Sequence, residues 1–185
     1  EQSDANYVLI LSGDDIYRMD YAAMLLFHVE QGAVATIACM EVGLGEARGF
    51  GVMAVDHGRR VLDFEEKPAE PRSLPENSEC ALASMGIYVF NLDALRTALQ
   101  ADQDEPASSH DFGQDILPRL IREQPVYAYP FGSHEGRVSQ DRYWKDVGTL
   151  DAYYEANLAL LDPVPSLNLY QRDWPIRTYL PQSPP

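Results

Sequence analysis

Residues 7–20 read Tyr-Val-Leu-Ile-Leu-Ser-Gly-Asp-Asp-Ile-Tyr-Arg-Met-Asp, and the prediction of the fold starts from them. Val8 to Leu11 is an apolar run without polar alternation, which predicts a central strand covered on both faces in a parallel sheet. Asp14 and Asp15 follow it at the carboxyl end of the strand, where open α/β sheets bind ligands. The two carboxylates could hold a divalent cation against phosphate oxygens, or they could simply open a turn.

The whole chain has the size and composition of one globular domain. Its 185 residues are 45% hydrophobic and 23% charged, enough for a sizeable core. The formal net charge of −15 argues against nucleic acid or an anionic membrane as the main partner. Cys39 and Cys80 lie far apart without CxxC spacing, so we expect buried thiols of a reducing compartment. No apolar run in the sequence reaches the length of a membrane span.

Helices and strands are predicted to alternate along the chain, which indicates an α/β fold. Asp20 can cap a helix that ends near Gly32, and residues 33–40 form the next apolar strand, giving a βαβ unit. Residues 51–55 and 60–64 are expected to form a hairpin with Gly58 at a positive φ. Further strands are expected at 82–90 and 126–131, and helices at about 92–101, 111–121 and 150–161. Pro118 should kink the helix over residues 111–121. Residues 42–50 are expected to form a loop.

The two ends of the chain differ from the middle. Residues 163–185 are rich in proline and predict an extended linker after a domain that covers residues 1–162. The chain starts at Glu1 without Met and enters a core strand within a few residues. We therefore expect a piece of a longer protein.

Asp14 and Asp146 are the two carboxylates that we pair as candidate metal ligands. Each follows a predicted strand and precedes a turn, so the alternating topology could bring both to one sheet edge, where they would hold Mg²⁺. The alternative is that Asp146 caps the following helix or forms a surface pair with Lys145.

Glu66 and Lys67 stand at the end of a predicted strand, directly before a proline. Pro68 should keep Lys67 extended, which would send the two side chains to opposite faces. Lys67 could then meet a phosphate, and Glu66 could accept hydrogen bonds from sugar hydroxyls. The alternative is a solvated hairpin end.

Other residues give weaker signals. Gly86, close to Ser84 in a predicted strand, suggests close approach of a ligand or of another backbone. His28 lies on an apolar helix stripe and is expected to be packed and hydrogen-bonded. The histidines, His110 among them, lack zinc-ligand spacing.

Several strings of the sequence resemble bacterial glucose-1-phosphate adenylyltransferases, the ADP-glucose pyrophosphorylases. They are SGDDIYRMDY (12–21), FGVMAVD (50–56), FEEKP (64–68), ASMGIYVF (83–90), SSHDFG (108–113), YWKDVGT (143–149) and DWPIRTY (173–179). The GD, EKP and DVGT strings are common to sugar nucleotidyltransferases, whereas SHDFG and WPIRTY are similar to the adenylyltransferase branch.

The resemblance implies a Rossmann-like sugar-nucleotidyltransferase domain with a mixed, mostly parallel sheet. It implies transfer of the adenylyl group of ATP to α-D-glucose 1-phosphate, with ADP-glucose and pyrophosphate as products, for glycogen biosynthesis. By the same resemblance, Asp14 is the catalytic, Mg²⁺-binding aspartate and Asp146 the second metal ligand. Lys67 matches the lysine on the sugar phosphate, and contacts to glucose 1-phosphate are implied for three residues, Gly51, Glu66 and Ser84.

The resemblance also sets expectations for the whole protein. A Gly-rich nucleotide loop would precede Glu1 and a left-handed β-helix would follow Pro185, in a cytoplasmic, allosteric homotetramer. The 185 residues alone are then expected not to catalyse the reaction. Asp15 stands where relatives often carry His, which could change the local charge. Two alternatives stay open: a thymidylyl- or uridylyltransferase of the same kind, or a non-catalytic regulatory subunit.

Overall fold

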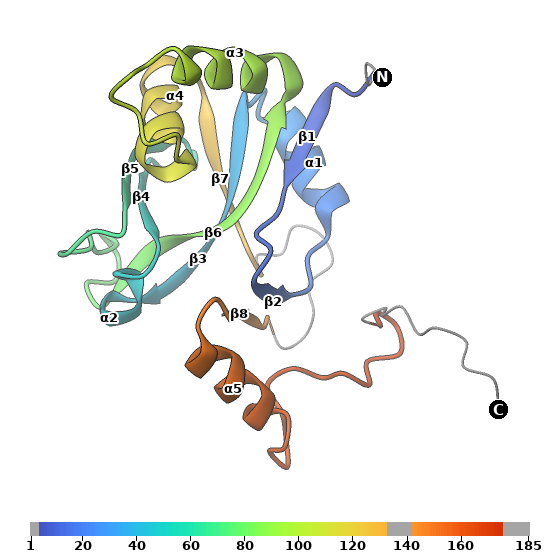
Figure 1. Cartoon of the computed structure of the whole chain (residues 1–185). Helices are drawn as coiled ribbons and strands as arrows, with labels where there is room; N and C mark the ends of the chain where they lie inside the picture. The colour runs from blue at the N-terminus through green and yellow to red at the C-terminus, as the bar shows by residue number, and fades with distance from the viewer. Residues whose placement is uncertain (1–3, 133–141, 176–185) are drawn as a thin grey trace. The chain divides into compact units, whose positions relative to one another are not determined.

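A computed structural model describes residues 4–132 and 142–175 of the chain (Figure 1). The described residues form two compact units. The first comprises residues 4–13 and 20–132, and the second comprises residues 14–19 and 142–175. Each unit is therefore considered by itself. The predicted division at residue 162 stays a prediction.

The first unit is built on one sheet with helices packed against it. Its strands are β1 (Tyr7–Ile10), β3 (Ala35–Gly43), β4 (Gly51–Val55), β5 (Val61–Glu66), β6 (Cys80–Asn91) and β7 (Val126–Pro130). Its helices are α1 (Tyr21–Glu30), α2 (Leu44–Ala47), α3 (Leu92–Gln103), the π-helix η1 (Phe112–Ile116) and α4 (Leu117–Glu123). The second unit contains β2 (Asp15–Tyr17), β8 (Trp144–Asp146) and α5 (Leu150–Ala159).

The sheet is mixed, as expected, but its pairing is mostly antiparallel rather than mostly parallel. The strand order is β5-β4-β6-β3-β7, and β1 also pairs with β6. Among the described strand pairs, only β3 and β7 run parallel. The predicted βαβ unit is present in a wider form, because β1 and β3 are parallel to each other with β6 between them. The insertion of this one long strand converts the neighbouring pairs to antiparallel.

The strand β1 is not the doubly covered central strand that its apolar run predicted. Within the described residues it pairs with β6 alone. Val8 and Ile10 pack against the core, whereas Tyr7 and Leu9 keep 38% and 40% of their surface exposed. One face of this strand is thus covered, and its apolar side chains on the other face are only half-buried.

The strand β3 occupies the doubly covered position instead. Ala35, Ile37 and Cys39 are fully buried in the cluster that also holds Leu95 of α3 and Leu117 of α4. Successive side chains of a strand point to opposite faces, and Thr36, between the first two, lies 2.8 Å from the His28 ring of α1. This strand is therefore covered by α1 on one face and by α3 and α4 on the other.

The helix α1 begins and ends where the sequence predicted. Asp20 accepts a hydrogen bond from the Ala23 amide at 3.1 Å, and Gly32 has a φ of 59° just beyond the end. His28 is 1% exposed, and its ring nitrogens lie 2.8 Å from Thr36 Oγ1 and 3.2 Å from Asn91 Oδ1. The prediction of a packed, hydrogen-bonded histidine is confirmed, and burial lowers the pKa of this imidazole.

The hairpin of β4 and β5 is confirmed, with a different residue in the left-handed conformation. Arg59 has a φ of 66°, where a positive φ at Gly58 was expected. Asp56 Oδ1 accepts from the amides of Gly58 and Arg60 at 2.8 and 2.9 Å, so a side chain shapes the turn. The short helix α2 lies in the stretch predicted as a loop.

The helix predicted over residues 111–121 consists of two pieces. Asp111 Oδ1 accepts from the amides of Gly113 and Gln114 at 2.8 and 2.9 Å, which confirms the predicted cap. The first turn is the π-helix η1, and Pro118 stands in the first turn of α4 rather than inside a kinked helix. Proline is tolerated there because it has no amide hydrogen to donate and the first turn of a helix does not require one.

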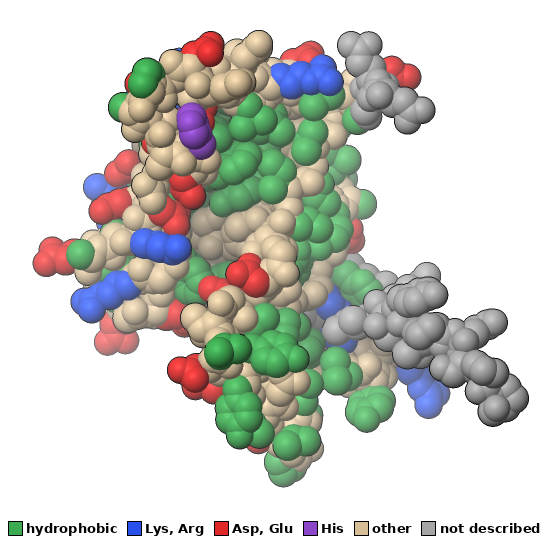
Figure 2. Space-filling view, viewed as in Figure 1, with side chains coloured by type: hydrophobic (Ala, Val, Ile, Leu, Met, Phe, Trp, Pro, Cys, Tyr) green, Lys and Arg blue, Asp and Glu red, His purple; other side chains and the backbone are tan. Residues whose placement is uncertain are grey.

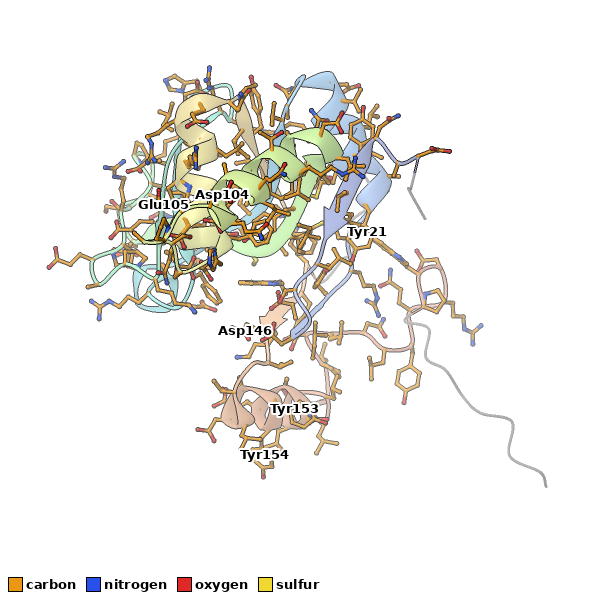
Figure 3. The ribbon with its side chains drawn as sticks, turned by 45° about the horizontal axis from the view of Figure 1, so that its top comes forward. Tyr21, Asp104, Glu105, Asp146, Tyr153 and Tyr154 are labelled. Atoms are coloured by element: carbon orange, nitrogen blue, oxygen red, sulfur yellow. The ribbon has the colours of Figure 1, made fainter. Side chains whose placement is uncertain are left out.

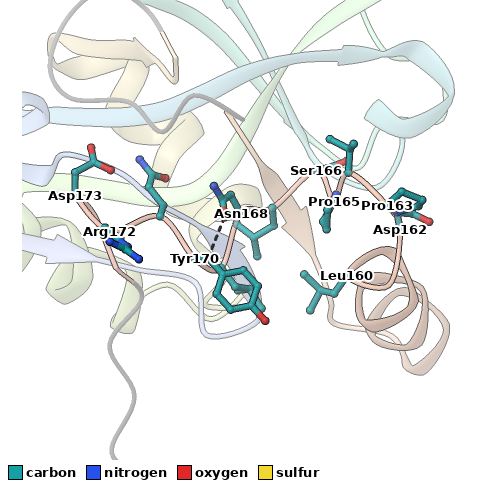
Figure 4. A pocket seen from close by; sticks show the side chains of 13 residues that line it. Leu160, Asp162, Pro163, Pro165, Ser166, Asn168, Tyr170, Arg172 and Asp173 are labelled. Atoms are coloured by element: carbon teal, nitrogen blue, oxygen red, sulfur yellow. Dashed lines mark hydrogen bonds between the residues drawn. The ribbon is translucent and has the colours of Figure 1, made fainter.

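In the second unit, the described part of the predicted linker, residues 163–175, contains no helix or strand. It is nevertheless held in place, because Arg18 is 5% exposed and donates to Asn168 O and Gln171 Oε1 at 2.5 and 2.9 Å. The run from Leu160 to Asp173 curls around a hollow (Figure 4). That hollow includes none of the predicted site residues.

The helix α5 keeps an apolar face exposed. Tyr153 and Tyr154 are 58% and 64% exposed and point away from the ribbon (Figure 3). Leu150 and Leu158 extend this apolar surface, which is visible over α5 in Figure 2. Among the described residues, none of the helices has the length and apolar character needed to cross a membrane.

Candidate functional site

Three carboxylates gather in the second unit, where β2 and β8 pair. The antiparallel register places Asp15 opposite Asp146, and the Val147 amide donates to Asp14 O at 2.8 Å. One oxygen from each of Asp14, Asp15 and Asp146 lies within 4.8 Å of the others. The structure thus brings together the two aspartates paired from the sequence, and adds a third.

The alternative roles considered for Asp146 are not what the structure shows. The cap of α5 is Thr149, whose Oγ1 accepts from the Ala152 amide at 3.1 Å. Lys145 Nζ lies 3.8 Å from Glu155 Oε2 instead. Asp146 is left to face the other two carboxylates of the cluster.

Gly148 fixes the geometry of this cluster. Its amide donates to Asp146 Oδ1 at 2.7 Å. A Cβ at this position would lie 2.7 Å from Asp14 Oδ2, closer than real Cβ contacts, and 3.0 Å from Asp146 Oδ1, which is also unusually tight. Only a residue without a side chain leaves both oxygens in place. The glycine of the Asp-Val-Gly-Thr string was the signal for this role, which the sequence alone did not assign.

The carboxylate cluster suits a hard divalent cation by its chemistry. All three ligands are oxygens, which Mg²⁺ prefers. The residues are at least partly exposed, so coordination positions remain for water or phosphate oxygens. Among the described residues, this is the one group of three acidic, histidine or cysteine side chains that could hold a metal ion.

Glu66 defines a second candidate site, in the first unit. Its carboxylate lies against two backbone positions, Gly51 of β4 and Gly113 of η1. A Cβ on Gly51 would come within 2.9 Å of Glu66 Oε2 and would overlap the Phe64 ring. A Cβ on Gly113 would overlap Oε2 and lie 2.9 Å from Glu66 Cδ. A side chain at either glycine would therefore displace the carboxylate.

Burial is the main reason that the pKa of Glu66 is raised. The side chain keeps only 21% of its surface exposed. The Lys67 ammonium lowers the pKa and the Asp111 carboxylate raises it again, and burial outweighs both. Carboxyl groups with a raised pKa cluster at functional sites.

Lys67 departs from the extended conformation that Pro68 predicted. Its φ is 47°, and its amide donates to Phe50 O at 3.1 Å. Glu66 and Lys67 are therefore not directed to opposite faces, and their charged groups lie 3.8 Å apart. This hydrogen bond to Phe50, the residue before β4, outweighs the preference of a residue before proline for the extended conformation. The Lys67 side chain is still 66% exposed and accessible to an anion.

Ser84 lies beside a bulge in β6. Opposite Ala38, the register jumps from the Ile37–Tyr88 pair to the Cys39–Ser84 pair. Gly86 within the bulge has a φ of 68°, which explains a glycine inside a strand. Ser84 Oγ accepts from the Gly86 amide at 3.3 Å. The hydroxyl therefore shapes the bulge.

An α/β domain with a cluster of three aspartates and a partly buried glutamate beside an exposed lysine is suited to binding phosphorylated ligands. Residues 1–163 match the family described as nucleotidyl transferase, so the chain belongs to the nucleotidyl transferase family.

Within this family the chain is similar to particular curated proteins. It is 55% identical over 185 residues to glucose-1-phosphate adenylyltransferase 2 of Vibrio vulnificus (strain CMCP6), covering all of this chain and 46% of that protein. It is 56% identical over 184 residues to glucose-1-phosphate adenylyltransferase 2 of Vibrio cholerae, covering 100% of this chain and 45% of the relative. It is also 55% identical to glucose-1-phosphate adenylyltransferase of Methylobacillus flagellatus, covering 100% of this chain and 43% of the relative. The chain spans less than half the length of these relatives.

Proposed function

We propose that the whole protein transfers the adenylyl group of ATP to α-D-glucose 1-phosphate, giving ADP-glucose and pyrophosphate for glycogen biosynthesis. The observation that carries this proposal is the 55% identity, along all 185 residues, to proteins named for this activity. The aspartate cluster and the Glu66–Lys67 pair supply the side chains that such a transfer needs.

Asp14 and Asp146 are the proposed ligands of Mg²⁺, with Asp15 beside them. When bound, the ion would shield the negative charge of the reacting phosphates. The protein's own part is to keep the carboxylates close together. The amide of Gly148 holds one oxygen of Asp146, and the pairing of β2 with β8 sets the spacing of the aspartates.

The sugar phosphate is assigned to the first unit. The exposed Lys67 ammonium would bind its phosphate as a point charge, and Glu66 would accept a hydrogen bond from a sugar hydroxyl. Gly51 and Ser84 are proposed to line the same site. An oxygen of the sugar phosphate would attack the α-phosphorus of ATP as pyrophosphate leaves. This transfer depends on positioning and charge neutralisation rather than on an enzyme nucleophile.

The test is a nucleotide panel on the full-length protein. We expect pyrophosphate release with ATP and glucose 1-phosphate to exceed that with UTP, dTTP, CTP or GTP. A preference for dTTP or UTP would replace the proposal with the corresponding thymidylyl- or uridylyltransferase. No turnover with any of the five nucleotides, in a folded protein supplied with Mg²⁺, would favour the regulatory subunit.

The resemblance alone extends the proposal to the assembly. A homotetramer, allosteric control and a cytoplasmic location are proposed for the full-length protein. Sedimentation of the purified protein tests the first, because a tetramer and a monomer differ fourfold in mass. Fractionation of cells and kinetic titration with candidate phosphorylated effectors test the other two.

A further inference from the structure

The position of Glu66 depends on a segment that is distant in sequence. Gly113 forms one wall of the space around the Glu66 carboxylate. It lies in the first turn of η1, where Asp111 accepts its amide hydrogen at 2.8 Å. The Asp111 amide in turn donates to Asp115 Oδ2 at 3.1 Å. Any shift of the chain just before Asp111 would therefore move this wall against the glutamate.

That preceding residue is His110, which adopts an unusual backbone conformation. Its φ is 60°, in the left-handed region that costs a residue with a Cβ on the order of 1 kcal/mol or more. A non-glycine residue stays in this region only when its surroundings hold it there. The contacts of the loop that follows α3 must therefore supply the constraint.

Asp102, in the last turn of α3, supplies it. The residue is 8% exposed. Its Oδ2 lies 2.8 Å from His110 Nδ1, and its Oδ1 accepts from Ser108 Oγ at 2.5 Å. The His110 amide donates to Ser108 Oγ at 3.0 Å. The hydrogen bonds that Ser108 and His110 donate to the Asp102 carboxylate lower its pKa. The bond from Ser108 has the larger effect. One carboxylate thus ties the loop to the helix end.

The energy of the His110–Asp102 pair matters less than its geometry. The imidazole is 59% exposed, and ion pairs of such exposed groups contribute little to stability. Together with the hydrogen bonds from Ser109 to Asp115 Oδ2, the pair holds the loop in which His110 is left-handed and from which the chain turns directly into Asp111 and η1. Nothing in the Asp-Phe-Gly sequence that follows requires this conformation by itself.

We propose that Asp102 and His110 are positioning residues for the sugar-phosphate site, because they hold the loop that places Gly113 against Glu66. This inference rests on the proposed function, since it assigns the residues that shape one of its substrate sites. Neither residue need touch the substrate. Their effect is transmitted through the backbone of residues 110–113.

The experiment compares His110→Ala with His110→Asn in the full-length protein. Alanine loses the hydrogen bond and disfavours the left-handed conformation, whereas asparagine tolerates it. We expect H110A to raise the KM for glucose 1-phosphate roughly ten- to a hundredfold, the value of the proposed hydrogen bond between a sugar hydroxyl and the displaced Glu66 carboxylate. The KM for ATP and kcat should change less than about threefold, as for lost ground-state binding at a single site. H110N should recover most of the loss. His57→Ala removes an exposed histidine from the β4–β5 turn and is the matched control.

A second measurement does not depend on catalysis. The carboxyl titration of Glu66, followed by ¹³C NMR and assigned with Glu66→Gln, should give a pKa above the ordinary value in the unaltered protein and in H57A. In H110A it should return toward that ordinary value, because the glutamate gains solvent. Lys67 and Asp111 are the charged groups that also influence it.

The outcomes separate the two proposals. An unchanged glucose 1-phosphate KM in H110A, or an H110N no better than H110A, would overturn the positioning role. So would equal losses in both KM values and in kcat. If H110A does not fold, Asp102→Asn replaces it and should show the same selective KM effect. If the unaltered protein makes no ADP-glucose, the proposed function fails, and the Glu66 titration alone decides the positioning role.

Discussion

Asp146 is the side chain on which the proposed metal site depends most directly. Its carboxylate faces Asp14 and Asp15 and is oriented by the Gly148 amide. Asp146→Asn keeps the shape and removes one negative charge. We expect Mg²⁺-dependent turnover of the full-length protein to fall by roughly a hundredfold or more, the range for loss of a group that stabilises the reacting phosphates.

The control for this variant is an exposed carboxylate outside the cluster. Asp104 is the C-cap residue that follows α3 (Figure 3), and Asp104→Asn should leave turnover unchanged. Binding of Mn²⁺, measured by paramagnetic resonance, gives a readout without catalysis and should weaken in Asp146→Asn and in Asp14→Asn. Near-normal turnover and Mn²⁺ affinity in both aspartate variants would remove the basis for the metal assignment.

Gly148 gives a sharper test, because the substitution adds only a methyl group. In Gly148→Ala the new Cβ would come within 2.7 Å of Asp14 Oδ2 and 3.0 Å of Asp146 Oδ1 and displace at least the first oxygen. We expect Mn²⁺ affinity to fall about ten- to a hundredfold, as for residues that orient metal ligands. Gly45→Ala is the matched control, since its Cβ would meet nothing within 4 Å. Equal affinities in the two variants would show that the spacing of the aspartates does not matter.

At the scale of the residue, the sequence predicted features that depend on neighbouring residues. It failed for residues whose conformation or role is set by a segment distant in sequence. Asp14 and Asp146 could be paired because each follows a strand and precedes a turn. The conformation of Lys67 could not be predicted, because it is set by the Phe50 carbonyl rather than by Pro68. The role of Gly113 was hidden for the same reason: its partner, Glu66, belongs to another element.

At the scale of the element, capping carries a measurable part of the stability. Asp20 accepts from the Ala23 amide at the start of α1. Asp20→Ala should lower the free energy of unfolding by about 1 kcal/mol, the usual loss for an N-cap. Asp20→Asn keeps an acceptor oxygen and should lose much less. Urea unfolding followed by circular dichroism measures both, and equal losses in the two variants would contradict the capping role.

The elements themselves were largely predictable, and their pairing was not. Periodicity and turn residues located α1, α3, α5 and the β4–β5 hairpin, because each depends on neighbours within a few residues. The order of the sheet depends on β6, whose twelve residues pair with β1, β3 and β4. An apolar run such as β1 does not reveal which strand it will meet. The bulge at Gly86 and the π-helix η1 are equally invisible in local patterns.

At the scale of the whole molecule, the burial of β3 provides a probe of global unfolding. Cys39 is fully buried in its centre, and burial raises the pKa of its thiol to about 12. Cys80, at the start of β6, is only partly buried. Because the thiolate is the reacting form, Cys39 should react with a thiol reagent only after the core opens.

We therefore expect the two cysteines to be modified at very different rates under native conditions. A thiol reagent at pH 8 should label Cys80 on the order of a thousandfold faster than Cys39, because opening of a stable core is populated at about that level or below. Cys80→Ser isolates the slow reaction and Cys39→Ala the fast one, and in concentrated urea the rates should converge. If Cys39 reacted in native buffer as fast as Cys80, β3 could not be the doubly covered strand of the sheet. The packing of α1 and of α3 with α4 on its two faces would then have to be abandoned.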